Sequence, residues 1–109
     1  MRAARLHAVK TFVSRNFNRQ DLSVGSVAVH LGVTPRYIHM LFENETESFS
    51  EFLLAQRLTH VHQALTDQRF AGRSISTIAF DSGFSDLSSF NRAFRRRFGM
   101  TPSEVRHPG

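Results

Sequence analysis

Side chains that suit nucleic acid are concentrated between residues 87 and 97 of this 109-residue chain. Asparagine can pair with the edge of adenine, and the planar fork of arginine fits guanine or a phosphate. After the apolar positions of a helix in this segment are set aside, a polar face remains. Residues of this face that we expect to contact base edges are Leu87, Ser88, Asn91 and Arg92. Those that we expect to bind phosphate are Arg95 and Arg96.

Metal binding and catalysis receive no support from the residue pattern. The chain has no cysteine, which excludes disulfides and thiolate metal sites. His60 and His62 are two positions apart and diverge on a helix, and no His-Glu-x-x-His motif accompanies them. There is also no Gly-x-Ser-x-Gly motif and no glycine-rich phosphate loop. We therefore expect no metal, no cofactor and no enzymatic activity.

The composition favours an anionic partner. Fourteen basic residues oppose nine acidic ones, the net charge is +5, and thirteen of the basic residues are arginine. Hydrophobic residues make up 40% of the chain, enough for the core of one domain. No apolar run is long enough for a membrane span or a signal peptide. We expect a single domain over residues 1–109, located in the cytoplasm and not bound to a membrane.

Helical periodicity extends along nearly the whole chain, and no segment alternates with a period of two. A stripe from Leu6 through Lys10 to Phe17 predicts a first helix over about 3–17. A Ser-x-x-Glu capping box at Ser48 begins the longest helix, over about 48–66. Caps, prolines and apolar spacing place the other helices at about 23–31, 34–42, 74–83, 86–97 and 101–106, with a loop over 67–73. The prediction is an all-α fold of seven helices.

One pattern occurs twice in the sequence. Ala28 is followed after four positions by Gly32 and then by apolar residues, and Ala79 is followed in the same way by Gly83. A small residue suits the steep crossing of two helices, and glycine suits a left-handed turn between them. The repeat predicts two helix-turn-helix units, whereas a plain helical bundle with glycine caps is the alternative. The units and the linker helix between them are expected over about 6–47, 74–106 and 48–66.

The first unit carries its own candidates on the helix that follows Pro35. Residues expected to face away from the core and to contact bases are Arg36, His39 and Met40. Tyr37 is expected either to bind a phosphate or to cover the edge of the core. The first N–H groups of a helix can bind phosphate. We therefore also expect phosphate contacts at the helix starts marked by Ser23 and Ser74.

Many residues of the second unit form a recognisable signature. They are Ser74-Ile75, Ile78-Ala79-Phe80, Gly83-Phe84-Ser85-Asp86, Ser89-Phe90, Arg92-Ala93-Phe94, Phe98-Gly99 and Thr101-Pro102-Ser103-Glu104. Through these residues the chain resembles the AraC/XylS family of transcription regulators. The first unit is similar at Ala28, Gly32-Val33-Thr34-Pro35-Arg36-Tyr37 and Leu41-Phe42, and the linker helix at Arg57-Leu58. The resemblance covers about residues 6–106.

The resemblance implies a monomeric domain that binds double-stranded DNA, with two recognition helices in adjacent major-groove segments about 34 Å apart. It also implies a bacterial-type regulator, an activator that contacts RNA polymerase. The chain is then expected to be either a fragment that lacks the family's usual effector-binding or dimerisation domain, or a minimal stand-alone member. Arg57 is expected to be a structural ion-pair partner.

The chain departs from the family after its first recognition helix, where Asn44-Glu45-Thr46-Glu47 stands in place of the usual glycine turn. Acidic residues near phosphate weaken binding, so we expect the second unit to supply more of the affinity. The acidic segment 43–51 also leaves an alternative open, a helical protein-interaction module with weak or vestigial DNA binding.

Overall fold

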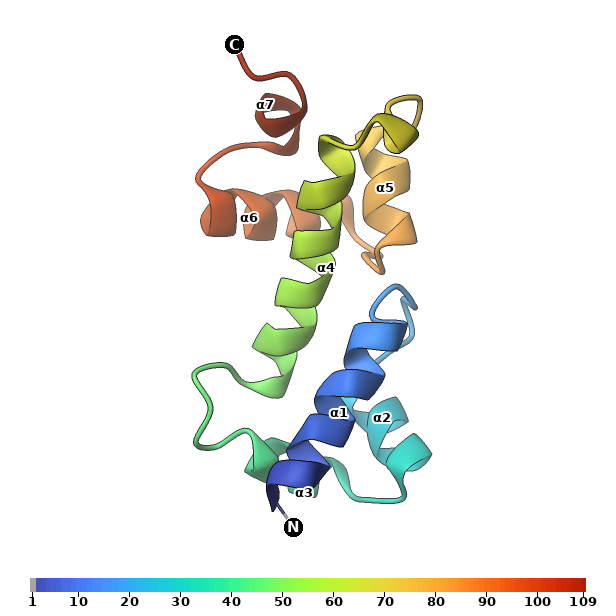
Figure 1. Ribbon diagram of the computed structural model, residues 1–109, viewed down its shortest axis with the longest axis vertical. Helices are drawn as coiled ribbons and strands as arrows, with labels where there is room; N and C mark the ends of the chain where they lie inside the picture. Colours follow the sequence, from blue (N-terminus) through green and yellow to red (C-terminus); the bar gives the residue numbers. More distant parts are fainter. Residues whose placement is uncertain (1) are drawn as a thin grey trace.

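The computed structural model describes residues 2–109, and throughout this range the regular structure is helical, without a strand (Figure 1). The seven predicted helices are confirmed, and their bounds are α1 Arg2–Asn16, α2 Val24–Leu31, α3 Pro35–Leu41, α4 Phe49–Leu65, α5 Ile75–Asp81, α6 Leu87–Phe98 and α7 Pro102–Arg106. The stretch predicted as a loop after α4 contains a short 3-10 helix, η1, over Gln68–Phe70. It begins there because the Asp67 side chain accepts a hydrogen bond from the Arg69 N–H (2.9 Å).

Side-chain caps fix the starts of the helices. At α4, Ser48 accepts a hydrogen bond from the Glu51 N–H (3.1 Å), and the Glu51 carboxylate accepts one from the Ser48 N–H (2.9 Å). Thr101 and Glu104 form the same reciprocal pair at α7. These bonds satisfy N–H groups that have no partner within the helix. The hydrogen bonds from the backbone and side chain of Ser48 also lower the pKa of Glu51.

Two separate apolar clusters stabilise the fold, and α4 contributes to both. The first cluster joins α1, α2 and α3 to the start of α4, with Val13, Ile38 and Phe49 among its most buried members. The second joins the rest of α4 to α5, α6 and α7 through residues such as Val61 and Phe94. In Figure 1, α4 runs along the long axis, with α1 to α3 near its lower end and α5 to α7 around its upper end.

The two predicted turns have the same backbone hydrogen bond. Between α2 and α3, the N–H of the residue after Gly32 donates to the carbonyl oxygen of Ala28 (3.0 Å). Between α5 and α6, the N–H of the residue after Gly83 donates to the carbonyl oxygen of Ala79 (3.1 Å). Both glycines have positive φ angles, +70° and +103°, in a region that strains other residues. The repeat seen in the sequence is therefore a repeat in three dimensions.

The molecule is elongated, with principal extents of 48 × 23 × 23 Å. Of the helices that follow the two turns, α3 lies near the lower end of the long axis, and α6 runs across this axis in the upper half of the molecule, below α7 (Figure 1). None of the helices within residues 2–109 has the length and apolar character that crossing a lipid bilayer requires.

Candidate nucleic-acid interface

One side of α6 is buried and the other is polar. Phe90 and Phe94 are 1% and 0% exposed and anchor the helix in the second cluster. The exposed side carries three of the predicted base-contacting residues, Ser88, Asn91 and Arg92. The fourth, Leu87, is half-buried and packs against the second cluster, so only part of its side chain faces solvent. The structure thus brings three polar candidates together on one exposed surface.

A chain of hydrogen bonds orients Arg92. Asp86 caps α6 by accepting from the Ser88 N–H (3.1 Å), and its second carboxylate oxygen accepts from the Ser89 hydroxyl (2.6 Å). The Arg92 guanidinium donates to the same hydroxyl oxygen (3.4 Å). The hydrogen bond from Ser89, followed by that from the Ser88 backbone, lowers the pKa of Asp86, and the charge of Arg92 adds to the effect. The Ser89 hydroxyl thus connects the helix cap to the guanidinium of Arg92.

The three consecutive arginines at the end of α6 are all exposed but have different surroundings. Arg95 follows Asn91 by four positions and therefore lies on the same face of the helix. Arg96 and Arg97 line a hollow that they share with the carboxylates Glu47 and Glu51. The polar face of α6 thus continues through Arg95, whereas Arg96 lies beside acidic groups.

The helix α3 presents the second candidate surface. Ile38 is fully buried and holds the helix in the first cluster. The predicted base-contacting residues are exposed and line one open groove, namely Arg36, His39 and Met40. Tyr37 is half-buried and packs against the first cluster, with the Arg5 guanidinium 6.0 Å from its ring centroid. Its ring covers the edge of the core, which was one of its two predicted roles.

Basic residues of α1 lie against the acidic segment after α3. Arg2 donates to the carbonyl oxygen of Met40 and lies 3.8 Å from the Glu43 carboxylate. The Lys10 ammonium group donates to the Glu45 carboxylate (2.7 Å). Lys10 is therefore not simply part of an apolar stripe, because its stem is half-buried while its charged end reaches an acidic partner. No pattern in the residues predicted that α1 would offset the acidic charge beside α3.

Ser23 and Ser74, predicted at phosphate-binding helix starts, are helix caps. Ser23 Oγ accepts from the Ser26 N–H (3.1 Å), and Ser74 Oγ accepts from the Thr77 N–H (3.1 Å). The Ser23 N–H in turn donates to Ser26 Oγ (2.9 Å). The hydroxyl groups thus serve their own helices. Any phosphate at these starts would meet backbone N–H groups rather than the serine side chains.

The expectation that Arg57 forms an ion pair is wrong. Arg57 Nε donates to the carbonyl oxygen of Phe17 (2.8 Å), and a terminal nitrogen donates to that of Arg19 (2.8 Å). Backbone carbonyls take the place of a carboxylate because the loop after α1 brings two of them to the same side of α4. Burial lowers the pKa of Arg57.

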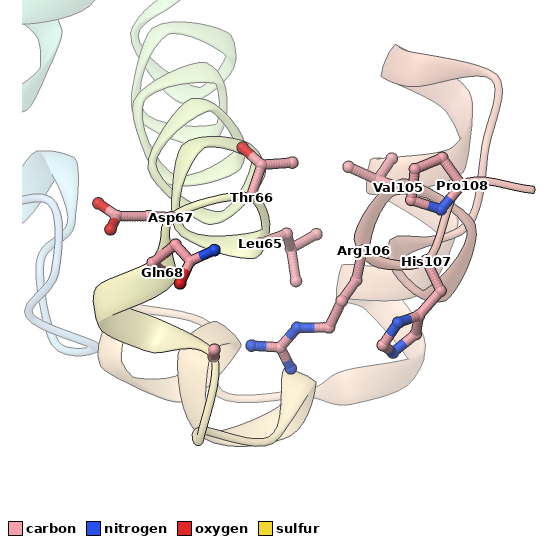
Figure 2. Close-up of a pocket in the computed structure, with 9 residues that line it drawn as sticks. Leu65, Thr66, Asp67, Gln68, Val105, Arg106, His107 and Pro108 are labelled. Atoms are coloured by element: carbon pink, nitrogen blue, oxygen red, sulfur yellow. The ribbon is translucent and has the colours of Figure 1, made fainter.

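The hollow beside the end of α4 is crossed by an arginine that joins two parts of the second unit. Within residues 2–109, no group of three or more His, Asp or Glu side chains is placed to hold a metal ion. Figure 2 shows the hollow between the end of α4, the η1 segment and α7, where Arg106 extends toward the loop. Its guanidinium donates to the carbonyl oxygens of Arg73 (2.6 Å) and Phe70 (2.8 Å). This arginine joins α7 to the loop before α5.

Two helix-turn-helix units on one shared helix, each with an exposed polar face, define a DNA-binding domain. A family model described as "Helix-turn-helix domain" matches residues 27–107. The chain belongs to the AraC/XylS family of DNA-binding transcription regulators, as its sequence motifs predict.

Relatives of different lengths carry the same domain. Transcriptional activator RhrA of Rhizobium meliloti (strain 1021) is 38% identical over 102 residues, which cover 94% of this chain and 32% of that protein. Regulatory protein SoxS of Salmonella typhimurium is 34% identical over 89 residues, which cover 81% of this chain and 80% of SoxS. The chain therefore spans about a third of the first relative and most of the second.

Solved structures share the fold over nearly the whole chain. The C-terminal domain of AraT, a response regulator from Geobacillus stearothermophilus, has a TM-score of 0.86 and 25% identity, covering 95% of this chain and 84% of that one. A regulator with an AraC-type DNA-binding domain from Chromobacterium violaceum has a TM-score of 0.80 and 27% identity, covering 98% and 96%. The arrangement of seven helices is thus that of the family.

Proposed function

We propose that this chain reads two adjacent major-groove segments of a promoter through α3 and α6 and activates transcription. The observation that carries the proposal is a pair of matching turns, each followed by a helix with an exposed polar face, in a molecule 48 Å long. Adjacent major-groove segments on one side of B-DNA lie about 34 Å apart, a separation that this length accommodates. The name of RhrA, a transcriptional activator, supports activation as the outcome.

The proposed division of labour follows from side-chain chemistry. Base contacts are assigned to Arg36, His39 and Met40 on α3 and to Leu87, Ser88, Asn91 and Arg92 on α6. Arginine suits guanine, asparagine suits adenine, and the apolar side chains suit the thymine methyl group. Phosphate contacts are assigned to Arg95 and Arg96, to the backbone at Ser23 and Ser74, and to the hydroxyl group of Tyr37, whose ring packs on the first cluster. The phosphate contacts supply affinity, and the base contacts supply the choice of sequence.

Selection of bound sites from random duplex DNA tests this function. We expect a site with two preferred segments about ten base pairs apart, from centre to centre. Affinity for this site should fall steeply with salt because bound arginines release counterions. Arg15→Ala, which removes an exposed arginine from α1, serves as a control for net charge alone. Equal, weak binding to every duplex would contradict the proposal.

We further propose that the domain binds its site as a monomer in the cytoplasm, contacts RNA polymerase there and catalyses no reaction. Because one chain already carries two recognition helices, a second copy is not needed to contact two DNA segments. Sedimentation of the complex with a single site should give one protein per duplex. Transcription in vitro from a promoter that carries the site should rise when the protein is added, whereas a fall would assign it to repression.

The alternative, a protein-interaction module, was based on the acidic segment 43–51. In the structure, Glu43 and Glu45 are paired with basic residues of α1, and Glu51 caps α4. These carboxylates are used within the molecule, which favours DNA binding over recognition of a partner by charge.

A further inference from the structure

The loop between α1 and α2 contacts the turn between α5 and α6, which belongs to the other unit. The Gln20 side-chain N–H donates to the carbonyl oxygen of Phe84 (3.0 Å), across 64 positions of sequence. In Figure 1 the loop after α1 lies directly beneath the α5–α6 turn. We name residues 17–20, Arg57, His60 and residues 82–84 the inter-unit junction. The apolar clusters of the two units are separate; Phe17 packs against the first and Phe84 belongs to the second, so the hydrogen bonds of the junction connect the two units.

The junction has no room for a side chain at Gly83. A Cβ atom built there would lie 2.5 Å from Arg57 Nε and closer still to the carbonyl oxygen of Phe17, the group that Arg57 binds. A Cβ built at Gly32, the equivalent residue of the first unit, would meet nothing within 4 Å. Both positions have a positive φ, so the difference between them is the close packing of the second turn against the first unit.

A buried serine continues the junction. Ser82 is 0% exposed, and its hydroxyl donates to the Ile78 carbonyl oxygen (2.7 Å). Because a hydroxyl has one hydrogen, the bond between Ser82 Oγ and His60 Nδ1 (2.7 Å) must have His60 as its donor. The His60 ring in turn lies 5.3 Å, centroid to centroid, from the ring of Phe17. The equivalent position of the first unit is the apolar Leu31.

We propose that the inter-unit junction fixes the position of α6 relative to α3 and so makes the protein selective for the spacing between the two DNA segments that it reads. The DNA part of this proposal rests on the proposed function. One inserted base pair moves a segment by about 3.4 Å and turns it by about 35°. Two rigidly connected readers cannot follow that change, whereas loosely connected readers can. A contact made of directional hydrogen bonds suits this role because it favours one orientation.

The first test measures the geometry without DNA. The chain has no cysteine, so Val29→Cys on α2, where the side chain is 84% exposed, and Ser103→Cys on α7 can carry spin labels. Electron–electron double resonance should give one narrow distance distribution for the otherwise unchanged protein. Replacing the junction donors by Arg57→Met and Gln20→Ala should broaden or shift it. Circular dichroism confirms that each variant is folded, and Gln20→Ala alone, at an exposed position, provides a mild variant.

The second test measures the spacing preference on the selected site. With one base pair inserted between the segments, the unchanged protein should lose ~100-fold in affinity, because simultaneous engagement is lost. The Arg57→Met, Gln20→Ala variant should bind the original site more weakly and lose less than ~5-fold on insertion, since a flexible connection tolerates both spacings. Gly83→Ala should behave like this variant, whereas Gly32→Ala, also at a positive φ but with nothing within 4 Å of the added Cβ, should keep the preference.

The two tests separate the possible failures. An unchanged distance distribution after loss of the Gln20 and Arg57 donors would overturn the inference, whatever the DNA shows. An altered distribution with an unchanged spacing preference would overturn its link to DNA spacing. Absence of any preferred site for the unchanged protein would refute the proposed function, and the distances would still show whether the junction orients the units.

Discussion

At the scale of single residues, Arg92 of the candidate interface is exposed and is also hydrogen-bonded within the molecule. Arg92 faces solvent, yet its guanidinium donates to the Ser89 hydroxyl, which in turn donates to the Asp86 carboxylate. Ordering a long side chain before binding lowers the entropy lost on binding. The same carboxylate caps the helix, so helix formation and orientation of the arginine depend on one group.

Arg92→Ala should cost about 1–3 kcal/mol of binding free energy and relax the preference at a single base pair, as expected for a base-edge contact. Competition among sites that differ at one position each would measure this. Equal weakening on every site would assign Arg92 to a phosphate instead.

Arg96→Ala should weaken binding to all sequences by a similar factor and lower the salt slope by about 1, as expected for a phosphate contact. Titrations at several salt concentrations would measure the slope, with Arg15→Ala as the charge-matched control. A changed base preference would show that Arg96 reads sequence. No loss at all would indicate that the nearby Glu47 and Glu51 keep it from DNA.

At the scale of helices, small residues at the paired turns determine how closely the helices approach. Ala79 is fully buried in the second unit, as Ala28 is in the first. Ala79→Leu should destabilise the fold by about 1–3 kcal/mol because a packed core has no room for added methylenes. Urea unfolding would measure the loss, and Ala8→Leu at an exposed position of α1 is the control. A neutral result for Ala79→Leu would mean that α5 can shift away from its neighbours.

The helix caps predict how stability depends on pH. Hydrogen bonds from the Ser48 backbone and side chain lower the pKa of Glu51, and those from Thr101 do the same for Glu104. A carboxyl group whose pKa is lower in the folded state stabilises the fold above its unfolded pKa, and this contribution is lost as pH falls through the folded value. The melting temperature should therefore be steady near neutral pH and fall below about pH 4.

The variant Glu51→Gln, Glu104→Gln removes the titrating carboxyl groups from the caps of α4 and α7. Its melting temperature should be lower near neutral pH and should fall less between about pH 5 and pH 2 than that of the unchanged protein. Thermal melts across this range would measure both slopes. Identical slopes would mean that other carboxyl groups account for the acid sensitivity.

At the scale of the whole molecule, local features were predictable and long-range polar contacts were not. Helices, turns and caps follow from residues within a few positions of one another, such as Ser48 and Glu51. The partners of Arg57 are backbone carbonyls. Every residue has such a carbonyl, so no sequence pattern predicts which ones an arginine binds. The pairing of Lys10 with Glu45 depends on how α1 packs against the segment after α3. The polar faces of α3 and α6 were predictable because the spacing of apolar residues assigns one side of each helix to the core and leaves the other side exposed.

The helix α4 has a consequence for how the protein unfolds. Its first turns supply Phe49 and Leu53 to one apolar cluster, and its later turns supply Leu58 and Val61 to the other. Unfolding of either half of α4 would remove contacts that stabilise the other half. The two apolar clusters should therefore unfold together. Scanning calorimetry should show a single heat-absorption peak whose calorimetric and van't Hoff enthalpies agree. Although built from two similar halves, the protein should behave as one cooperative unit.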